Sequence, residues 1–159
     1  MKRLNLGSGG DYKEGWINCD IRKDIKTDVV LDLKKKLPFE DNSVDEILMK
    51  HVLEHVPGYG SLLREMHRVC KRGAIINILV PFFSNQNMFG SPNHINFFNY
   101  GTLEPYEGLF HIKPHIDFFI DRNSKLIDKL INWKPYVYLR FFCWVFPSSQ
   151  IRYKLIVKK

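Results

Sequence analysis

The first stretch with the composition of a binding site is Gly7-Ser8-Gly9-Gly10, which directly follows the apolar residues Leu4 and Leu6. The alternation of Leu4 and Leu6 predicts the end of a short buried strand. A glycine-rich turn at the carboxyl end of a strand lets a ligand touch bare backbone, and its free N–H groups suit a carboxylate or a phosphate. An ordinary loop has the same composition, so the stretch by itself leaves both interpretations open.

Histidines are the second group of candidates, because a histidine side chain can remove a proton from a reacting group. His94 lies in 91–98, a polar and aromatic part of a long loop that follows the apolar run 74–80. A loop at that position is expected to overhang the active edge of a sheet. His94 is therefore a candidate catalytic residue, with a purely structural loop histidine as the alternative. The further candidates are His51, His55, His111 and His115.

The spacing of these histidines does not predict a metal site. His51 and His55 are four residues apart with Glu54 between them, whereas the zinc-protease motif has its glutamate directly after the first histidine. The second pair at this spacing, His111 and His115, encloses a proline. Proline breaks the helix that such a spacing requires, so no metal ligands are expected.

Short apolar runs alternate with amphipathic segments through most of the chain. Strands are expected over 4–6, 16–21, 27–33, 44–49, 74–80, 112–120 and 150–157, and the clearest helices over 61–72 and 124–131. This alternation predicts an α/β fold with a mainly parallel sheet. The interval between the first two strands is shorter than the roughly ten residues of a crossover helix. The first helix is therefore expected to be shortened or replaced by a loop.

The length of 159 residues fits one domain, which is expected to cover 1–159. The sequence shows no signal peptide and no apolar run long enough to cross a bilayer. The cysteines are far apart and form no metal-binding spacing: Cys19, Cys70 and Cys143. They are expected to be reduced thiols, which favours a cytoplasmic location.

Positive charge is concentrated at the C-terminal end. Residues 122–159 hold nine lysines and arginines against one acid, while the whole chain has a formal net charge of +7. Aromatic side chains are interleaved with Lys134 and Arg140 in this basic part. Core packing is one account of them, and an exposed apolar and basic surface is another. Such a surface, over 133–153, favours a homodimer or a protein partner over nucleic acid or an anionic membrane surface.

Several short motifs follow one another in order: Leu4-Asn5-Leu6-Gly7-Ser8-Gly9, Asn18-Cys19-Asp20-Ile21, Leu31-Asp32-Leu33 with Leu37-Pro38-Phe39, Ser43-Val44-Asp45 and His51-Val52-Leu53-Glu54-His55-Val56. In this order they resemble the class I S-adenosylmethionine-dependent methyltransferases, in the small-chain group similar to methyltransferase type 11. The resemblance covers residues 2–100. It implies a Rossmann-like three-layer sandwich with a mainly parallel sheet, an antiparallel last strand and a shortened first helix.

The resemblance also implies S-adenosylmethionine as cofactor and methyl transfer to an unidentified small-molecule or macromolecular acceptor. Asp20 would accept hydrogen bonds from both ribose hydroxyls, although a helix cap or a surface acid is its alternative role. Asp32 and Leu33 would meet the adenine, with Asp28 as a rival of Asp32. The implied cofactor-binding residues are Leu6, Gly7, Ser8, Gly9, Gly10, Asp20, Ile21, Asp32, Leu33, Lys50 and His51.

The sulfonium end of the cofactor would lie beside Lys50 and His51, and the candidate catalytic residues are His51 and His94. Two positions depart from the family pattern, which usually has an acid in place of Asn5 and often a third glycine in place of Asp11. Together with the shortened first helix, these departures predict an open wall of the cofactor site. The alternative function is a non-catalytic binding module that engages a partner, a membrane surface or nucleic acid through its basic aromatic C-terminal part.

Overall fold

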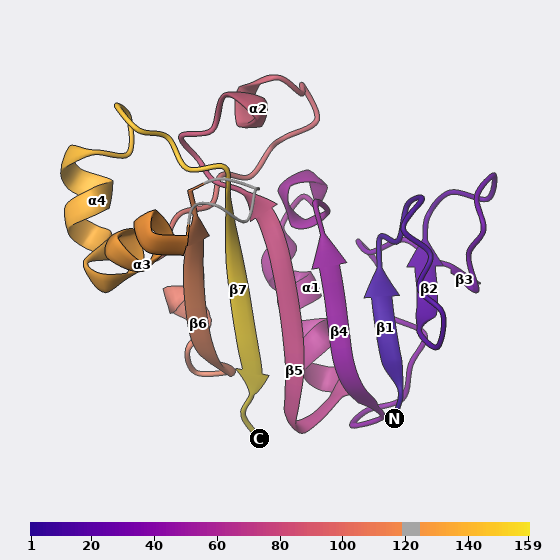
Figure 1. The fold of residues 1–159 in the computed structure, drawn as a ribbon. Helices are drawn as coiled ribbons and strands as arrows, with labels where there is room; N and C mark the ends of the chain where they lie inside the picture. Colours follow the sequence, from indigo (N-terminus) through magenta and orange to yellow (C-terminus); the bar gives the residue numbers. More distant parts are fainter. Residues whose placement is uncertain (119–124) are drawn as a thin grey trace.

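A computed structural model describes residues 1–118 and 125–159 of the chain. Its centre is a seven-stranded sheet with the order β3-β2-β1-β4-β5-β7-β6, shown in Figure 1. The strands are β1 (Arg3–Leu6), β2 (Ile17–Asp20), β3 (Val29–Val30), β4 (Val44–Lys50), β5 (Cys70–Pro81), β6 (Phe110–Asp117) and β7 (Gln150–Val157). The first five strands pair in parallel, and β7 runs antiparallel to both β5 and β6. The predicted Rossmann-like α/β sheet with an antiparallel last strand is confirmed.

The helices are short. They are α1 (Tyr59–Val69), α2 (Gln86–Phe89), α3 (Lys125–Trp133) and α4 (Pro135–Phe141), with the 3-10 turns η1 (Leu53–His55) and η2 (Glu104–Tyr106). The amphipathic helix predicted over 61–72 is α1, and its buried residues are Leu62, Leu63, Met66 and Val69. Figure 1 shows α1 behind β4 and β5, whereas α3 and α4 lie beside β6.

The C-terminal elements differ in extent from the predicted ones. The strand predicted over 112–120 begins earlier, at Phe110, and its last two residues lie outside the described ranges, as does the first residue of the helix predicted over 124–131. The apolar stretch near 136–146 forms α4 and the loop that follows it. No helix in the described ranges has both the length and the apolar character needed to span a membrane.

Two buried asparagines organise the connection between β1 and β2, which contains no helix. The Asn5 amide donates to the carbonyl of Asp11 at 2.8 Å and to Oδ1 of Asn18 at 3.0 Å. The same Asn18 oxygen accepts from the N–H of Lys13 at 2.9 Å. Buried amides require such partners, because an unpaired polar group away from water is costly. The predicted replacement of the first helix by a loop is confirmed, and Asn5 holds that loop in place.

The third strand is shorter than the predicted run 27–33, and side chains add to its contacts with β2. Only Val29–Val30 pairs with β2. The Thr27 hydroxyl donates to the carbonyl of Asn18 at 2.8 Å, and the Asp28 carboxylate accepts from the Asn18 N–H at 2.7 Å. The Asn18 side-chain amide donates to the same carboxylate at 3.0 Å, and the two hydrogen bonds from Asn18 lower the pKa of Asp28. Asp28 therefore anchors the edge of the sheet.

One face of the sheet is open over β4, β5, β7 and β6. Leu48, Asn77, Lys154 and Lys113 form one row across it through successive strand pairings. None of these four residues is buried, and a hollow of about 570 Å³ lies over them. Parallel sheets usually have both faces covered. The third layer of the sandwich is therefore incomplete in the described part of the chain.

The connection between β3 and β4 is fastened to α1 by one guanidinium group. Arg68 donates to the carbonyl oxygens of Leu37 and Phe39, each at 3.0 Å. It also donates to the carboxylates of Glu65, at 2.8 Å, and Asp41. The hydrogen bond from Arg68 is the main cause that lowers the pKa of Glu65. A segment without a helix is thus ordered by charged hydrogen bonds, which are stronger than neutral ones.

Replacing Arg68 with alanine should lower the free energy of unfolding by about 2 kcal/mol, because two carbonyls and two carboxylates lose their donor. Urea denaturation at pH 7 measures the loss. The Glu65 pKa is lowered in the folded state, so its contribution is present above the unfolded pKa and is lost as the pH falls through the folded pKa. The difference between the variant and the parent should therefore shrink in acid. The matched control is Arg64→Ala on the exposed side of α1, which should cost less than about 0.5 kcal/mol.

Candidate functional site

The glycine-rich bend after β1 is fastened to the end of β2. The N–H groups of Gly7 and Ser8 both donate to the carbonyl of Cys19, at 2.8 and 3.0 Å. The next N–H, of Gly9, donates to Oδ2 of Asp20 at 2.8 Å. The bend and the acid predicted to face each other across the carboxyl edge of the sheet are therefore in direct contact.

Glycine is required at the first position of this bend. Gly7 has a φ of +68°, in the left-handed region that other residues avoid. A Cβ placed on Gly7 would lie 2.4 Å from Cγ2 of Val52, which belongs to the segment between β4 and η1. The Val52 side chain in the turn after β4 thus packs directly on the Gly7 backbone in the turn after β1.

The Asp20 carboxylate is nearly buried, with 8% of the residue exposed. Its Oδ2 accepts from Gly9, and its Oδ1 accepts from the N–H of Arg22 at 3.0 Å. The Arg22 guanidinium lies 3.6 Å from Oδ1. A carboxylate offers about four acceptor positions, so hydrogen-bonding capacity remains for a ligand after these contacts.

A pocket of about 850 Å³ opens beside the bend. The carboxyl ends of parallel strands meet at one edge of the sheet, so the pocket gathers segments that are distant in sequence. The predicted site residues that line it are Gly7, Gly9, Asp20, Ile21, Asp32, Leu33 and His51. The remaining lining residues are Arg22, Leu31, Lys34, Val52, His55, Val56, Pro92, Asn93 and Ile95.

Other predicted cofactor-binding residues are not part of this lining. Leu6 is fully buried in the core, and Gly10 is exposed beyond the bend. The Ser8 hydroxyl is buried and has no hydrogen-bond partner among the described residues. Lys50 lines the hollow on the open face of the sheet, and its ammonium group pairs with Asp11 at 2.9 Å. The hydrogen bond from Lys50 is the main cause that lowers the pKa of Asp11.

The two candidate catalytic histidines have different positions. His51 follows β4 with a left-handed φ of +53°, and it lines the pocket. A non-glycine residue in this conformation is uncommon and often marks a functional site. His94 is not part of the pocket lining. Its ring lies 4.7 Å from the ring of His55, measured between centroids, and its Nδ1 is 3.0 Å from the carbonyl of Met88.

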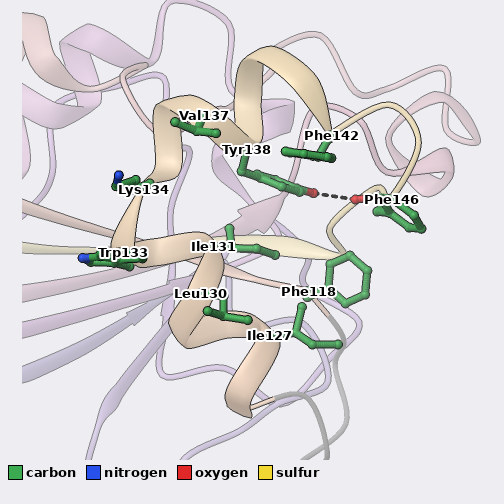
Figure 2. A pocket seen from close by; sticks show the side chains of 10 residues that line it. All are labelled: Phe118, Ile127, Leu130, Ile131, Trp133, Lys134, Val137, Tyr138, Phe142 and Phe146. Atoms are coloured by element: carbon green, nitrogen blue, oxygen red, sulfur yellow. Dashed lines mark hydrogen bonds between the residues drawn. The ribbon is translucent and has the colours of Figure 1, made fainter.

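A second hollow, of about 650 Å³, lies between α3 and α4 and is almost entirely apolar. Figure 2 shows Leu130 and Ile131 from α3 and Val137 and Tyr138 from α4 along its walls. The Tyr138 hydroxyl donates to the carbonyl of Phe146 at 2.7 Å, drawn as a dashed line, and closes one end. Most aromatic residues of this part are exposed rather than in the core: Trp133, Tyr136, Phe141, Phe142, Trp144 and Phe146.

The fold of the chain is that of solved S-adenosylmethionine-dependent methyltransferases. Residues 9–78 match the family model of a methyltransferase domain, which confirms the resemblance predicted from the motifs. Over 83 residues, 52% of the chain, the sequence is 34% identical to a demethylmenaquinone methyltransferase of Geobacillus stearothermophilus, and the match covers 34% of that protein. It is 50% identical over 40 residues to a demethylmenaquinone methyltransferase of Staphylococcus epidermidis, covering 17% of it. The chain thus spans about a third or less of the curated relatives it matches.

Solved structures share the fold along the whole chain. A SAM-dependent methyltransferase from Archaeoglobus fulgidus superposes with a TM-score of 0.69 and 21% identity, covering 98% of this chain and 86% of that one. A putative methyltransferase of Haloferax volcanii, solved in complex with the Trm112 methyltransferase activator, gives a TM-score of 0.67 and 14% identity. That match covers 99% of this chain and 83% of the other chain.

Sequence reasoning missed lining residues of two kinds. Arg22 and Val52 lie next to predicted positions in the sequence. Their closeness to Asp20 and His51 along the chain could have predicted them as lining residues. The loop 91–98 was expected to overhang this edge of the sheet, but only His94 was singled out in it, whereas the residues that line the pocket are Pro92, Asn93 and Ile95. They reach the pocket because the N–H groups of Ile95 and Asn96 donate to the carbonyl of Glu54, at 3.0 and 3.2 Å, and this contact exists only after folding.

Gly7→Ala should lower the free energy of unfolding by about 2 kcal/mol or more, because the new Cβ combines a strained φ with a clash against Val52. Urea denaturation measures the change. Gly10→Ala is the matched control, since its Cβ would meet nothing within 4 Å, and it should change stability by less than about 0.5 kcal/mol. Equal stability of the two variants would contradict the close approach of the two turns.

Proposed function

We propose that the protein transfers a methyl group from S-adenosylmethionine to an unidentified small-molecule or macromolecular acceptor. The observation that carries this proposal is the Asp20 carboxylate hydrogen-bonded to the Gly9 N–H at the wall of the 850 Å³ pocket. The family match over residues 9–78 and the fold support the reaction class. The curated relatives are named for demethylmenaquinone, but the match covers only 17 to 34% of their length. The acceptor of this chain is therefore left unidentified.

The residues around the bend fit this cofactor. Gly7 and Gly9 line the pocket and leave backbone bare for the methionine portion. Asp20 would accept from the ribose hydroxyls. One oxygen of Asp32 accepts from the N–H of Lys34 at 2.9 Å, which leaves the other for the adenine amine.

When bound, S-adenosylmethionine supplies a methyl group on a positively charged sulfur, which keeps the electrons of the broken carbon–sulfur bond while the acceptor lone pair forms the new bond. Holding the two reactants in line gives much of the acceleration in such a displacement. His51, at the pocket wall after β4, would take the proton of an acceptor that carries one. His94, whose ring lies beside that of His55, is the second candidate for this role.

Asp20→Asn should weaken binding of S-adenosylhomocysteine, the demethylated product, by about tenfold or more, because the amide replaces one acceptor oxygen with a donor. Isothermal titration calorimetry measures the affinity. Asp24→Asn, at an exposed position nearby, should bind the product like the parent. If the Asp20 variant retains parental affinity, the assignment of the ribose site is wrong.

A second candidate function is a binding module that keeps the fold and engages a protein partner or a second copy through 133–153. The exposed apolar residues around the α3–α4 hollow favour it, since large exposed apolar patches mark interaction sites. Lys134 and Arg140 lie against the rings of Trp133 and Phe141 and give this surface its charge. The complex of the Haloferax volcanii neighbour with an activator protein supports a protein partner in general.

If a second copy covers this surface, the chain should be a dimer at micromolar concentration, and the double variant Leu130→Glu/Trp133→Glu should be a monomer. Two buried charges would oppose the apolar contact. Light scattering after size exclusion measures the mass. The control Val30→Glu, an exposed apolar position on β3, should leave the mass unchanged. A monomeric parent would exclude the homodimer and leave a different partner.

A cytoplasmic location is part of this proposal. The three cysteines are free and buried, and burial raises the pKa of Cys19 and Cys70 to about 12. Unpaired cysteines of this kind are typical of proteins in a reducing compartment.

A further inference from the structure

Three side chains from two distant segments meet beside the pocket. Glu54 and His55 belong to η1, and His94 lies in the loop after β5. One oxygen or ring nitrogen from each residue lies within 4.8 Å of those of the other two. The helical spacing of His51 and His55 did not predict this group, because the third member is 39 residues away from His55 in the sequence.

The carboxylate of Glu54 lacks the partners that a buried charge requires. Its side chain is 1% exposed, and neither oxygen accepts a hydrogen bond from any described residue. The nearest basic group is Nδ1 of His51, at 3.5 Å from Oε1, which is charged only when protonated. Burial of an unpaired carboxylate is costly, whereas a bound cation removes that cost.

Each histidine holds a backbone carbonyl through one ring nitrogen. Nδ1 of His55 is 3.0 Å from the carbonyl of Asn93, and Nδ1 of His94 is 3.0 Å from the carbonyl of Met88. A carbonyl only accepts, so each Nδ1 carries a proton, and Nε2 is the ring nitrogen that remains to bind a metal ion. Metal-binding histidines typically donate their other N–H to a carbonyl in this way, which fixes the tautomer and the ring.

We propose that Glu54, His55 and His94 form a binding site for a divalent transition-metal ion of the Zn²⁺ type. Two imidazoles and one carboxylate are a ligand set that such ions accept, with at least one coordination position left open. Ligands at about 2.1 Å from zinc stand roughly 3.4 Å apart, so small side-chain rotations would complete the geometry. His55 lines the cofactor pocket, so the proposed metal site adjoins the pocket wall.

The proposed metal site goes beyond methyl transfer and does not depend on it for its test. If both hold, the metal ion would bind an oxygen of the acceptor and make its proton easier to remove. His94 would then serve as a ligand, and the role of base would remain with His51. This consequence rests on the proposed function and narrows the acceptor to a group that carries such an oxygen.

A second group of potential ligands provides the matched control. His115, Asp117 and Asp128 also approach one another within 4.8 Å. Their carboxylates are already engaged, since Asp117 pairs with Arg152 at 2.5 Å and Asp128 accepts from the N–H of Phe118 at 2.8 Å. His115→Gln should therefore leave metal binding at the Glu54 site unchanged.

The test is titration of the full chain with Co²⁺ at pH 7.5, followed by the visible absorption of the bound ion and by calorimetry. One ion should bind per chain. Glu54→Gln and His94→Gln should each weaken binding at least tenfold, while His115→Gln should bind like the parent. Absence of saturable binding in the parent would overturn the proposal. So would parental affinity in Glu54→Gln, or loss of binding in His115→Gln alone.

Thermal unfolding with and without Zn²⁺ gives a readout independent of activity. Without metal, Glu54→Gln should be at least as stable as the parent, because a buried unpaired charge is removed. Zn²⁺ should raise the unfolding temperature of the parent and of His115→Gln, but not of Glu54→Gln. Should Glu54→Gln fail to fold, His94→Gln in a partly exposed loop carries the same comparison. Binding of S-adenosylhomocysteine, measured in parallel, shows whether the cofactor proposal fails separately.

Discussion

The structure depends on the hydrogen bonds that tie the bend after β1 to the end of β2. Two successive N–H groups share the Cys19 carbonyl, and the Gly9 N–H reaches the Asp20 carboxylate. This arrangement needs backbone without side chains, because Val52 from the next strand end packs directly against Gly7. One short turn thereby fixes the relative position of the ends of β1, β2 and β4, which together form most of the pocket wall.

A chain of this length keeps the edge of the sheet by replacing helices with side-chain hydrogen bonds. Asn5 and Asn18 hold the loop between β1 and β2, and Arg68 holds the segment between β3 and β4. Each uses a few directed polar contacts where a helix would bury a broad apolar stripe. The consequence is an open sheet face over β4, β5 and β7 and a pocket wall formed by loops.

The two regions open to ligands differ in chemistry. The pocket at the bend combines bare backbone, acidic acceptors and histidines, which suits a polar ligand that makes directional contacts. The hollow between α3 and α4 is almost entirely apolar, and Lys134 is the cation among its lining residues. Such a surface gains from being covered, whatever covers it. The pocket is lined by residues from 7–95 and the apolar hollow by residues from 118–146, so the two regions are separate along the chain.

The sequence by itself determined the bend and most of the strands, although not the length of β3, because hydrophobic periodicity and glycine requirements are local properties. The same local pattern predicted Asp20 and Asp32 where their strands end. The short interval between the first two strands predicted a loop in place of the first helix. The tertiary structure decided the rest. Lys50 lies on the Leu48 face of β4 and pairs with Asp11, since alternate side chains of a strand point to opposite faces. His94 meets Glu54 and His55 only because the loop after β5 folds back over the edge of the sheet, and no spacing in the sequence encodes a contact between segments so far apart.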